Sequence, residues 1–194
     1  MREVLIAVLL ASAFSTANAG SDQSPEVNRP AVHPQGFTLT TTAFEDGGII
    51  PDKYTANASV NPVSPALQWS HVPAGTISFA LVMHDPDNSL NGGSEDILHW
   101  LIFNIPGTAN QLPEGVPPIA QLPDGSVQVV NLKHKYAYLS PGAWAPSPYH
   151  HHTFEILALD TQLKLGSETS RGDFLRGIEG HILSKAVLVG RFHR

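Results

Sequence analysis

The stretch ISFALVMHDPD, residues 77–87, contains the pattern that decides the fold. Its first part, residues 77–83, is a continuous apolar run, and its Ile, Phe and Val are residues favoured in β-strands. A short apolar run bounded by Pro, Gly and Asn predicts a buried strand with other structure packed on both of its faces. The stretch therefore predicts one strand of a β-sheet core, and that strand ends in two carboxylates.

Further runs along the chain have the same character. Residues 98–105, 154–159 and 186–192 are short and apolar, and residues 37–40 alternate between apolar and polar side chains. Each of these segments predicts a strand. Residues 106–126 carry five prolines and predict a loop. Gly and Pro each occur 16 times in the chain, which favours many turns between short strands over long helices.

One helix is predicted near the C-terminus. Ser170 and Asp173 have the spacing of a capping box, which marks the start of a helix. The apolar residues that follow at helical spacing are Phe174, Leu175, Ile178 and Ile182. We interpret these four as ordinary core packing. Three glycines in the same segment weaken the helix prediction.

The composition bounds the class of protein. The chain has 194 residues, the usual size of one domain and long enough to bury a sizeable core. Its formal net charge is −6, and its 11 Lys and Arg residues are scattered along the sequence. The basic stripe of a nucleic-acid-binding surface and the cluster of a polybasic membrane anchor are both missing from this pattern. We therefore expect no nucleic-acid partner.

The first residues have the features of a secretory signal peptide. Residues 4–14 are almost wholly apolar but too few to span a bilayer, and Ala17-Asn18-Ala19 is a typical cleavage signal. We predict a signal peptide over residues 1–19, a mature protein without an integral membrane segment, and a periplasmic or secreted location. The alternative is an ordinary buried N-terminal helix.

After the signal peptide we predict a flexible, polar, proline-broken lead-in over residues 20–36 and one folded domain over residues 37–194. The chain contains no cysteine. An exported protein without cysteine has neither a lipoprotein anchor nor a disulfide. Its stability must therefore come from core burial and hydrogen bonds.

Two carboxylates follow the strand predicted at residues 77–83. Asp85 and Asp87 flank Pro86, which fixes its own φ angle and biases Asp85 towards an extended conformation. This stiffness holds the carboxylates in a set relation at the end of the strand. The alternative interpretation is a solvated Asp-Pro turn, which is common.

Histidines gather at two other strands. The loop LSPGAWAPSPYHHHT, residues 139–153, ends in three of them, and in an extended chain His150 and His152 share one face while His151 faces the other. His99 lies in the run 98–105, where a core-facing histidine is usually a structural residue that needs a hydrogen-bond partner such as a neighbouring Asp. Each of these residues lies at or in a strand, so they are able to converge.

The motifs around these residues resemble those of the phosphatidylethanolamine-binding proteins, the family that includes the Raf kinase inhibitor protein and plant flowering regulators. One family signature is Asp-Pro-Asp after a strand, then His-Trp and Asn-Ile-Pro. The other is a Gly- and Pro-rich loop that leads through a histidine into a strand. The matching segments are DPD (85–87), HW (99–100), NIP (104–106), SPGA (140–143) and PYHHHTF (148–154), with NPVSPALQW (61–69) and EGHIL (179–183) resembling a further segment and the family's C-terminal helix.

The resemblance runs from about Phe37 to the C-terminus and is to the bacterial branch of the family, here in an exported form. It implies an all-β fold, with an antiparallel, sandwich-like β-sheet core and one or two short flanking helices including a C-terminal helix. It also implies a shallow pocket that accepts a phosphate or similar anion. The predicted ligand-binding residues are Asp85, Asp87, His99, His150, His152, Pro141 and Gly142.

Three positions depart from the family pattern. Ser140 replaces the usual Gly, so the loop backbone loses some freedom. Trp144 stands where Pro is common and could cover the mouth of the pocket. His152 stands where a Tyr is typical, which replaces a phenol with an imidazole and adds a second nitrogen and a possible charge.

The resemblance implies a non-enzymatic protein that binds a small anionic ligand, such as a phosphate ester, a phospholipid head group or a carboxylate, without a cofactor. Inhibition or regulation of a protein partner such as a protease is a further expectation. Carboxylates beside an anion repel it, but an Asp that accepts one ring N–H of a histidine leaves the other nitrogen aimed at the ligand.

Two other classes of function compete with this interpretation. His150 and His152, together with His99 or Asp85, have the ligand chemistry of a zinc site or a metalloenzyme. A serine hydrolase has weaker support because the sequence contains no G-x-S-x-G elbow.

Overall fold

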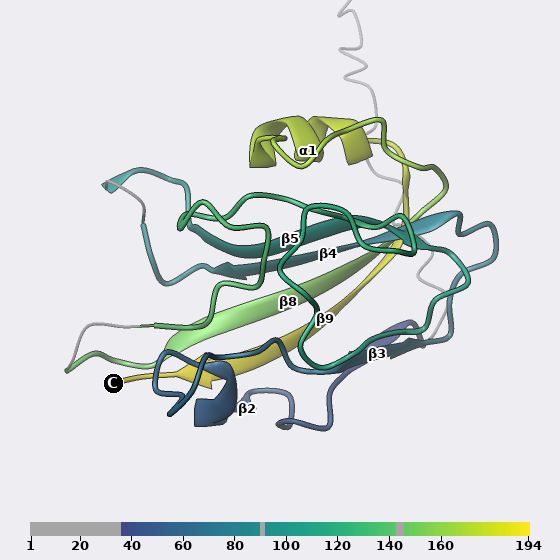
Figure 1. Cartoon of the computed structure of the whole chain (residues 1–194). Coiled ribbons are helices and arrows are strands. Elements are labelled where there is room, and N and C mark those ends of the chain that lie inside the picture. The colour runs from purple at the N-terminus through teal and green to yellow at the C-terminus, as the bar shows by residue number, and fades with distance from the viewer. Residues whose placement is uncertain (1–35, 90–91, 143–145) are drawn as a thin grey trace, which may run out of the picture. The chain divides into compact units, whose positions relative to one another are not determined.

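The structure is a computed structural model, and it describes residues 36–89, 92–142 and 146–194. The predicted signal peptide, most of the lead-in and Trp144 lie outside the described residues. Figure 1 shows two sheets with a helix, α1, above the larger of them. None of the helices in the described ranges has the length and apolar character needed to cross a bilayer.

The larger sheet has six strands in the order β2-β9-β8-β4-β5-β7. Its neighbouring strands are antiparallel, except that β2 runs parallel to β9. The strands are β2 (Gly48–Ile49), β4 (Ser78–Asp85), β5 (Ile97–Pro106), β7 (Val127–Gln128), β8 (His150–Leu159) and β9 (Ile182–Phe192).

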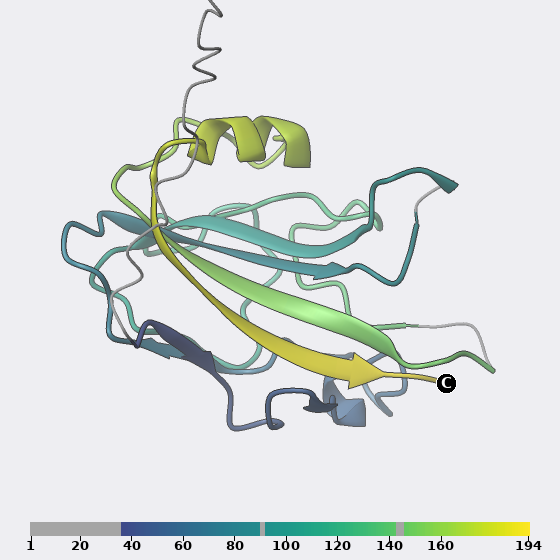
Figure 2. The same ribbon diagram turned by 180° about the vertical axis from the view of Figure 1, so that it is seen from behind.

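The smaller sheet has three antiparallel strands in the order β1-β3-β6. They are β1 (Thr38–Thr40), β3 (Leu67–Ser70) and β6 (Gln111–Leu112). The helical elements among the described residues are the short 3-10 helix η1 (Asp52–Tyr54) and α1 (Arg171–Ile178). Seen from behind in Figure 2, the small sheet and α1 lie on opposite faces of the large sheet. The fold class predicted from the motifs is confirmed.

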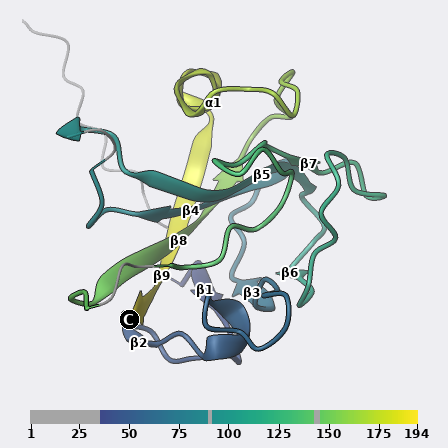
Figure 3. The same ribbon diagram turned by 60° about the vertical axis from the view of Figure 1, so that its left-hand side comes forward.

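Strand β4 shows how the large sheet buries both of its faces. Phe79, Leu81 and Met83 belong to a hydrophobic cluster that also contains residues of β1 and β3. Ala80 and Val82, which point to the opposite face, belong to a second cluster together with the buried side of α1. The continuous apolar run at residues 77–83 is therefore explained, because each face of the strand has its own covering layer (Figure 3).

Helix α1 begins as the capping box predicts. Ser170 is the N-cap residue, and its Oγ accepts a hydrogen bond of 3.0 Å from the backbone N–H of Asp173. The predicted extension of the helix to Ile182, and with it the helical interpretation of residues 179–183, was wrong. Gly180 has a φ of +80°, which turns the chain, and Ile182 begins strand β9. Ile182 packs against the core, as predicted, but it does so from a strand and not from a helix.

Candidate functional site

Three strand ends meet at one end of the large sheet. Because β4 lies between β5 and β8 and is antiparallel to both, its C-terminal end lies beside their N-terminal ends. The register pairs His84 of β4 with Leu98 of β5 and with Thr153 of β8. This pairing brings Asp85, the last residue of β4, next to the histidines of both neighbouring strands.

Asp85 is a buried carboxylate with three hydrogen-bond donors. Its Oδ1 accepts the backbone N–H of Asp87 at 3.0 Å, which closes a tight turn around Pro86. Its Oδ2 accepts from Nδ2 of Asn88 at 2.7 Å and lies 2.9 Å from Nδ1 of His150. The Asp-Pro turn is thus present, but its first carboxylate is inside the protein and not solvated.

Asp87 is not brought together with the other predicted pocket residues. Its carboxylate contacts His151 on the exposed face of β8, accepting from the backbone N–H at 2.6 Å and lying 2.8 Å from Nδ1. Partial burial alone raises the pKa of Asp87, but the hydrogen bonds from His151 outweigh it and hold that pKa below its usual range. Asp87 therefore fastens the turn to β8, outside the cluster around Asp85.

His99 lies at an irregularity of the sheet. The pairing of β4 with β5 shifts between Met83 and His84, whose partners are Trp100 and Leu98, so that His99 falls between two paired residues. Its Nδ1 donates to the carbonyl oxygen of Leu139 at 2.8 Å, and its own carbonyl accepts the Leu139 N–H at 2.9 Å. A bulge of this kind re-aims a side chain, and here it fixes the ring of His99.

The rings of His99 and His152 contact each other edge to face, with centroids 4.7 Å apart. His152 has no solvent exposure and His99 is 4% exposed. Burial lowers the pKa of His99, and burial together with the neighbouring His99 lowers the pKa of His152 to about 3. Burial therefore favours the neutral form of both rings and opposes the charge that the sequence allowed for His152.

Three ring nitrogens in this cluster have no hydrogen-bond partner within the described part of the chain. They are Nε2 of His99 and both nitrogens of His152. Nε2 of His152 lies 3.9 Å from Oδ2 of Asp85, beyond hydrogen-bond distance. One ligand atom each from Asp85, His99 and His152 lies within 4.8 Å of the others.

A cavity of about 250 Å³ opens at this end of the sheet. Its lining comprises Asn88, Ile97, Gly142, Pro146, Ser147, Pro148 and His150. Of the predicted loop residues, Gly142 lines the cavity. Pro141 does not belong to that lining, and its carbonyl accepts the backbone N–H of Ala56 at 2.8 Å, which anchors the loop beside Gly142.

Sequence reasoning missed Asn88. The amide of Asn88 lies beside both Asp85 and His150. Its Nδ2 is 2.7 Å from Oδ2 of Asp85 and 3.1 Å from Nδ1 of His150. The signal that could have found it is its place three residues after Asp85, in the turn that Pro86 stiffens.

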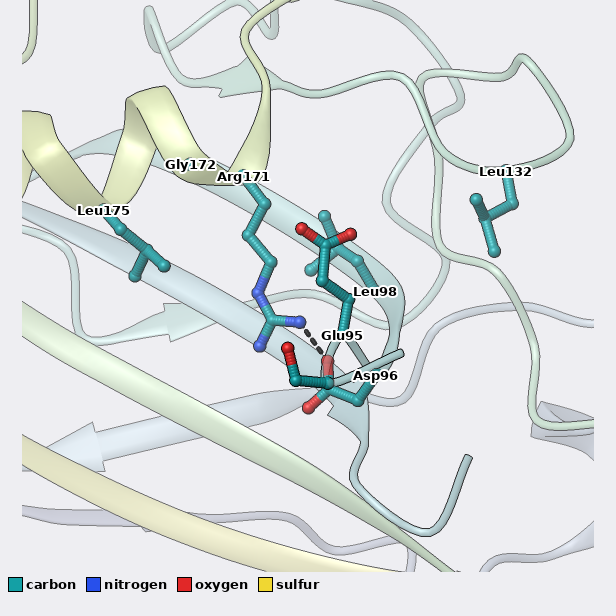
Figure 4. A pocket seen from close by; sticks show the side chains of 8 residues that line it. Glu95, Asp96, Leu98, Leu132, Arg171, Gly172 and Leu175 are labelled. Atoms are coloured by element: carbon teal, nitrogen blue, oxygen red, sulfur yellow. Dashed lines mark hydrogen bonds and ion pairs between the residues drawn. The ribbon is translucent and has the colours of Figure 1, made fainter. Parts of the chain in front are cut away.

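A larger cavity, of about 410 Å³, lies at the start of α1. Figure 4 shows the guanidinium of Arg171 pointing at the carboxylate of Asp96, with which it is paired. Asp96 also accepts from Nδ1 of His84 at 2.6 Å. Because the cation of Arg171 is already engaged, this cavity is a poorer candidate for an anion than the one beside His150.

The fold and the site together define a β-sheet protein with an Asp–His cluster at one end of its main sheet. A model of the family described as phosphatidylethanolamine-binding protein matches residues 40–193, and the chain belongs to that family, as its motifs predicted.

Relatives cover most of the chain. A UPF0098 protein of Methanothermobacter thermautotrophicus is 42% identical over 158 residues, which are 81% of this chain and 99% of that protein. The crystal structure of YbcL from E. coli, described as a new member of the mammalian PEBP family, is 25% identical with a TM-score of 0.72, over 81% of this chain and 98% of that one. The structure of CT736 from Chlamydia trachomatis, described as a PEBP homolog, is 28% identical with a TM-score of 0.71, over 82% and 98%.

Proposed function

We propose that this protein is a non-enzymatic binding protein for a small anion, such as a phosphate ester or a phospholipid head group, held in the cavity beside His150. The observation that carries the proposal is that His150 lines this cavity while its Nδ1 lies 2.9 Å from the buried carboxylate of Asp85. With Nδ1 held in this way, Nε2 is the ring nitrogen available to a ligand.

The chemistry of the lining suits a small polar group. A protonated His150 offers a charged N–H, and charge-assisted hydrogen bonds of this kind to a phosphate are the strong ones. Asn88 adds an amide in the same lining. A volume of about 250 Å³ is below the range of drug-sized ligand sites, so it fits a head group better than a whole lipid.

The lining also supports a binding role over a hydrolytic one. Ser147 contributes its hydroxyl, whose oxygen accepts from the backbone N–H of Arg194 at 3.4 Å. A serine nucleophile needs an imidazole or another base in hydrogen-bond reach, and no such partner of Ser147 occurs among the described residues. If the predicted export takes place, the ligand is an envelope lipid head group or an extracytoplasmic anion, and a protease is a suitable class of protein partner.

The proposal is tested by calorimetry with O-phosphoethanolamine in buffer containing a chelator. His150→Ala should bind at least on the order of 10-fold more weakly than the unmodified protein, because it loses a charge-assisted hydrogen bond. The matched control is His181→Ala, which removes an exposed histidine that pairs with Asp160 at 2.7 Å, remote from the cavity lining. A thermal melt of each variant separates lost binding from lost folding. Equal affinities for the unmodified protein and a folded His150→Ala would show that the site is misplaced.

A further inference from the structure

We propose that Asp85, His99 and His152 bind one divalent transition-metal ion of the zinc class, in the buried layer behind Asn88 and His150. The three side chains are at most 4% exposed, and their ligand atoms lie within 4.8 Å of one another. This site does not depend on the proposed anion-binding function, because the metal alone is the ligand.

The unpartnered nitrogens of His99 and His152 are the first argument. A buried polar atom without a hydrogen bond costs about 1–3 kcal/mol, and folded proteins rarely leave one without a reason. Here three such atoms lie on two rings that touch each other. A metal ion that takes a lone pair from each ring would satisfy two of the three atoms at once.

The tautomer of His99 is the second argument. Its Nδ1 donates to the Leu139 carbonyl at 2.8 Å, so that in the neutral ring Nε2 carries the lone pair. Histidine ligands of metals commonly have their other ring nitrogen fixed by a backbone carbonyl in this way. The ring of His99 is thus already oriented as a ligand.

The hydrogen bonds of Asp85 are the third argument. A carboxylate has about four lone-pair positions. Oδ1 accepts from Asp87 and Oδ2 accepts from both Asn88 and His150, so that one lone-pair position, on Oδ1, is left for a metal ion. Ligating carboxylates are themselves hydrogen-bonded in this manner, which holds them in place.

The distances define how far the site must close. Ligand atoms about 2.0–2.2 Å from a zinc ion are roughly 3.4 Å apart in a tetrahedral site. The ligand atoms, which are at most 4.8 Å apart, must therefore approach one another by no more than about 1.4 Å. Two imidazoles and one carboxylate suit zinc, iron, nickel or copper better than magnesium or calcium, and three protein ligands leave an open coordination position.

This assignment differs from the metal set that the sequence allowed. There His150 and His152 were the paired ligands, because they share a face of an extended strand. The structure instead directs Nδ1 of His150 to Asp85. In the proposed metal site, His150 therefore orients Asp85, which binds the metal, and does not bind the metal itself.

The test uses the purified protein after chelator treatment and gel filtration, titrated with Zn²⁺ alone and, for a spectroscopic signature, with Co²⁺ alone. We expect one ion per chain, a rise in melting temperature with Zn²⁺, and visible Co²⁺ absorption typical of a low-coordinate site. His152→Tyr and His99→Gln should each weaken Zn²⁺ binding on the order of 100-fold or more, since each removes a ligand. His181→Gln is the matched control and should bind like the unmodified protein.

Three results would overturn the proposal. The first is no stoichiometric binding by the unmodified protein, which would mean that buried water or nothing satisfies the rings. The second is binding that survives both His152→Tyr and His99→Gln, and the third is binding lost in His151→Gln instead, which would locate the metal on the surface. Because phosphate-ester binding is measured in chelator, failure of the metal site leaves the anion result intact, and the reverse also holds.

Discussion

Asp85 has no solvent exposure, yet its partner His150 comes from a segment 65 residues further along the chain. Removing one partner of a buried, hydrogen-bonded charge leaves the other unsatisfied. The structure of this corner therefore depends on the turn after β4 and the start of β8 being held together. The contact of Asp87 with His151 provides a second fastening of the same two segments, on the solvent side.

Gly190 is a residue whose missing side chain matters to this corner. It pairs with His152 in the register of β8 and β9. A Cβ at Gly190 would lie 2.5 Å from Cγ1 of Ile50 and 2.9 Å from Cε2 of Phe44. Ile50 is 1% exposed and has little room to move. Glycine here lets Ile50 and Phe44 pack directly on β9.

We expect Gly190→Ala to lower the free energy of unfolding by about 1–3 kcal/mol, because the new methyl group overpacks a buried contact. Urea unfolding monitored by tryptophan fluorescence measures this. The control is Gly166→Ala, where no atom lies within 4 Å of the added Cβ and the change should stay within about 0.5 kcal/mol. A Gly190→Ala protein as stable as the control would mean that Ile50 repacks freely.

Sequence patterns placed the candidate site residues at strands but did not predict their contacts. Asp85, His99 and His150 could be placed at strands because apolar runs and their ends are visible in one dimension. Which side chains meet is decided by strand register, and a register is a relation between distant segments. The sequence predicted Asp87 in the pocket, whereas the structure places Asn88 beside Asp85 and His150. The direction in which the turn points each side chain decides between them, and the sequence pattern does not show that direction.

At the scale of elements, the long strands were predicted and the shortest ones were not. β4, β5, β8 and β9 contain apolar runs that periodicity detects, and their observed bounds extend beyond those runs by one to four residues. Strands of two residues, such as β2 and β7, are too short to show a hydrophobic periodicity in the sequence. They are strands only because they pair with a longer neighbouring strand. The polar start of β8 falls within the predicted loop, because histidines do not give the apolar pattern that predicts a strand.

The cap of α1 gives a prediction for an element. Ser170→Ala removes the acceptor for the Asp173 N–H and should lower the free energy of unfolding by about 1 kcal/mol. Ser170→Asn restores a capping acceptor without adding charge beside Asp173, so it should recover most of the loss. Chemical denaturation of the three proteins makes the comparison. If alanine and asparagine are equally destabilising, the capping hydrogen bond is not what Ser170 contributes.

At the scale of the whole molecule, both faces of the large sheet are covered, one by the small sheet and the other by α1. A ligand can therefore reach polar side chains of the sheet at the ends of its strands, and the cavity beside His150 lies there. The two layers were implied by runs buried on both sides. What sequence patterns did not contain is the connection of α1 to the sheet, which includes the contacts of Asp96 with Arg171 and His84.

Asp96 links three elements, since it stands just before β5, His84 belongs to β4, and Arg171 begins α1. Burial alone raises the pKa of Asp96, but hydrogen bonds from Arg171 and His84 outweigh it and hold the pKa below its usual range.

A carboxyl group whose pKa is lower in the folded than in the unfolded protein stabilises the fold above its unfolded pKa, near 4, and loses that contribution as pH falls through the folded value. We therefore expect Asp96→Asn to cost about 2 kcal/mol at pH 7, and the difference from the unmodified protein to shrink as pH falls below about 4, where the unfolded carboxyl group takes up a proton before the folded one does. Asp173→Asn is the comparison, because that carboxylate is half exposed with its Arg176 partner and solvent screens the pair, so its loss should be smaller. Urea unfolding at pH 7, 5 and 3 decides the matter, and a loss in Asp96→Asn that stays constant across this range would show that the residue acts through packing and not through its charge.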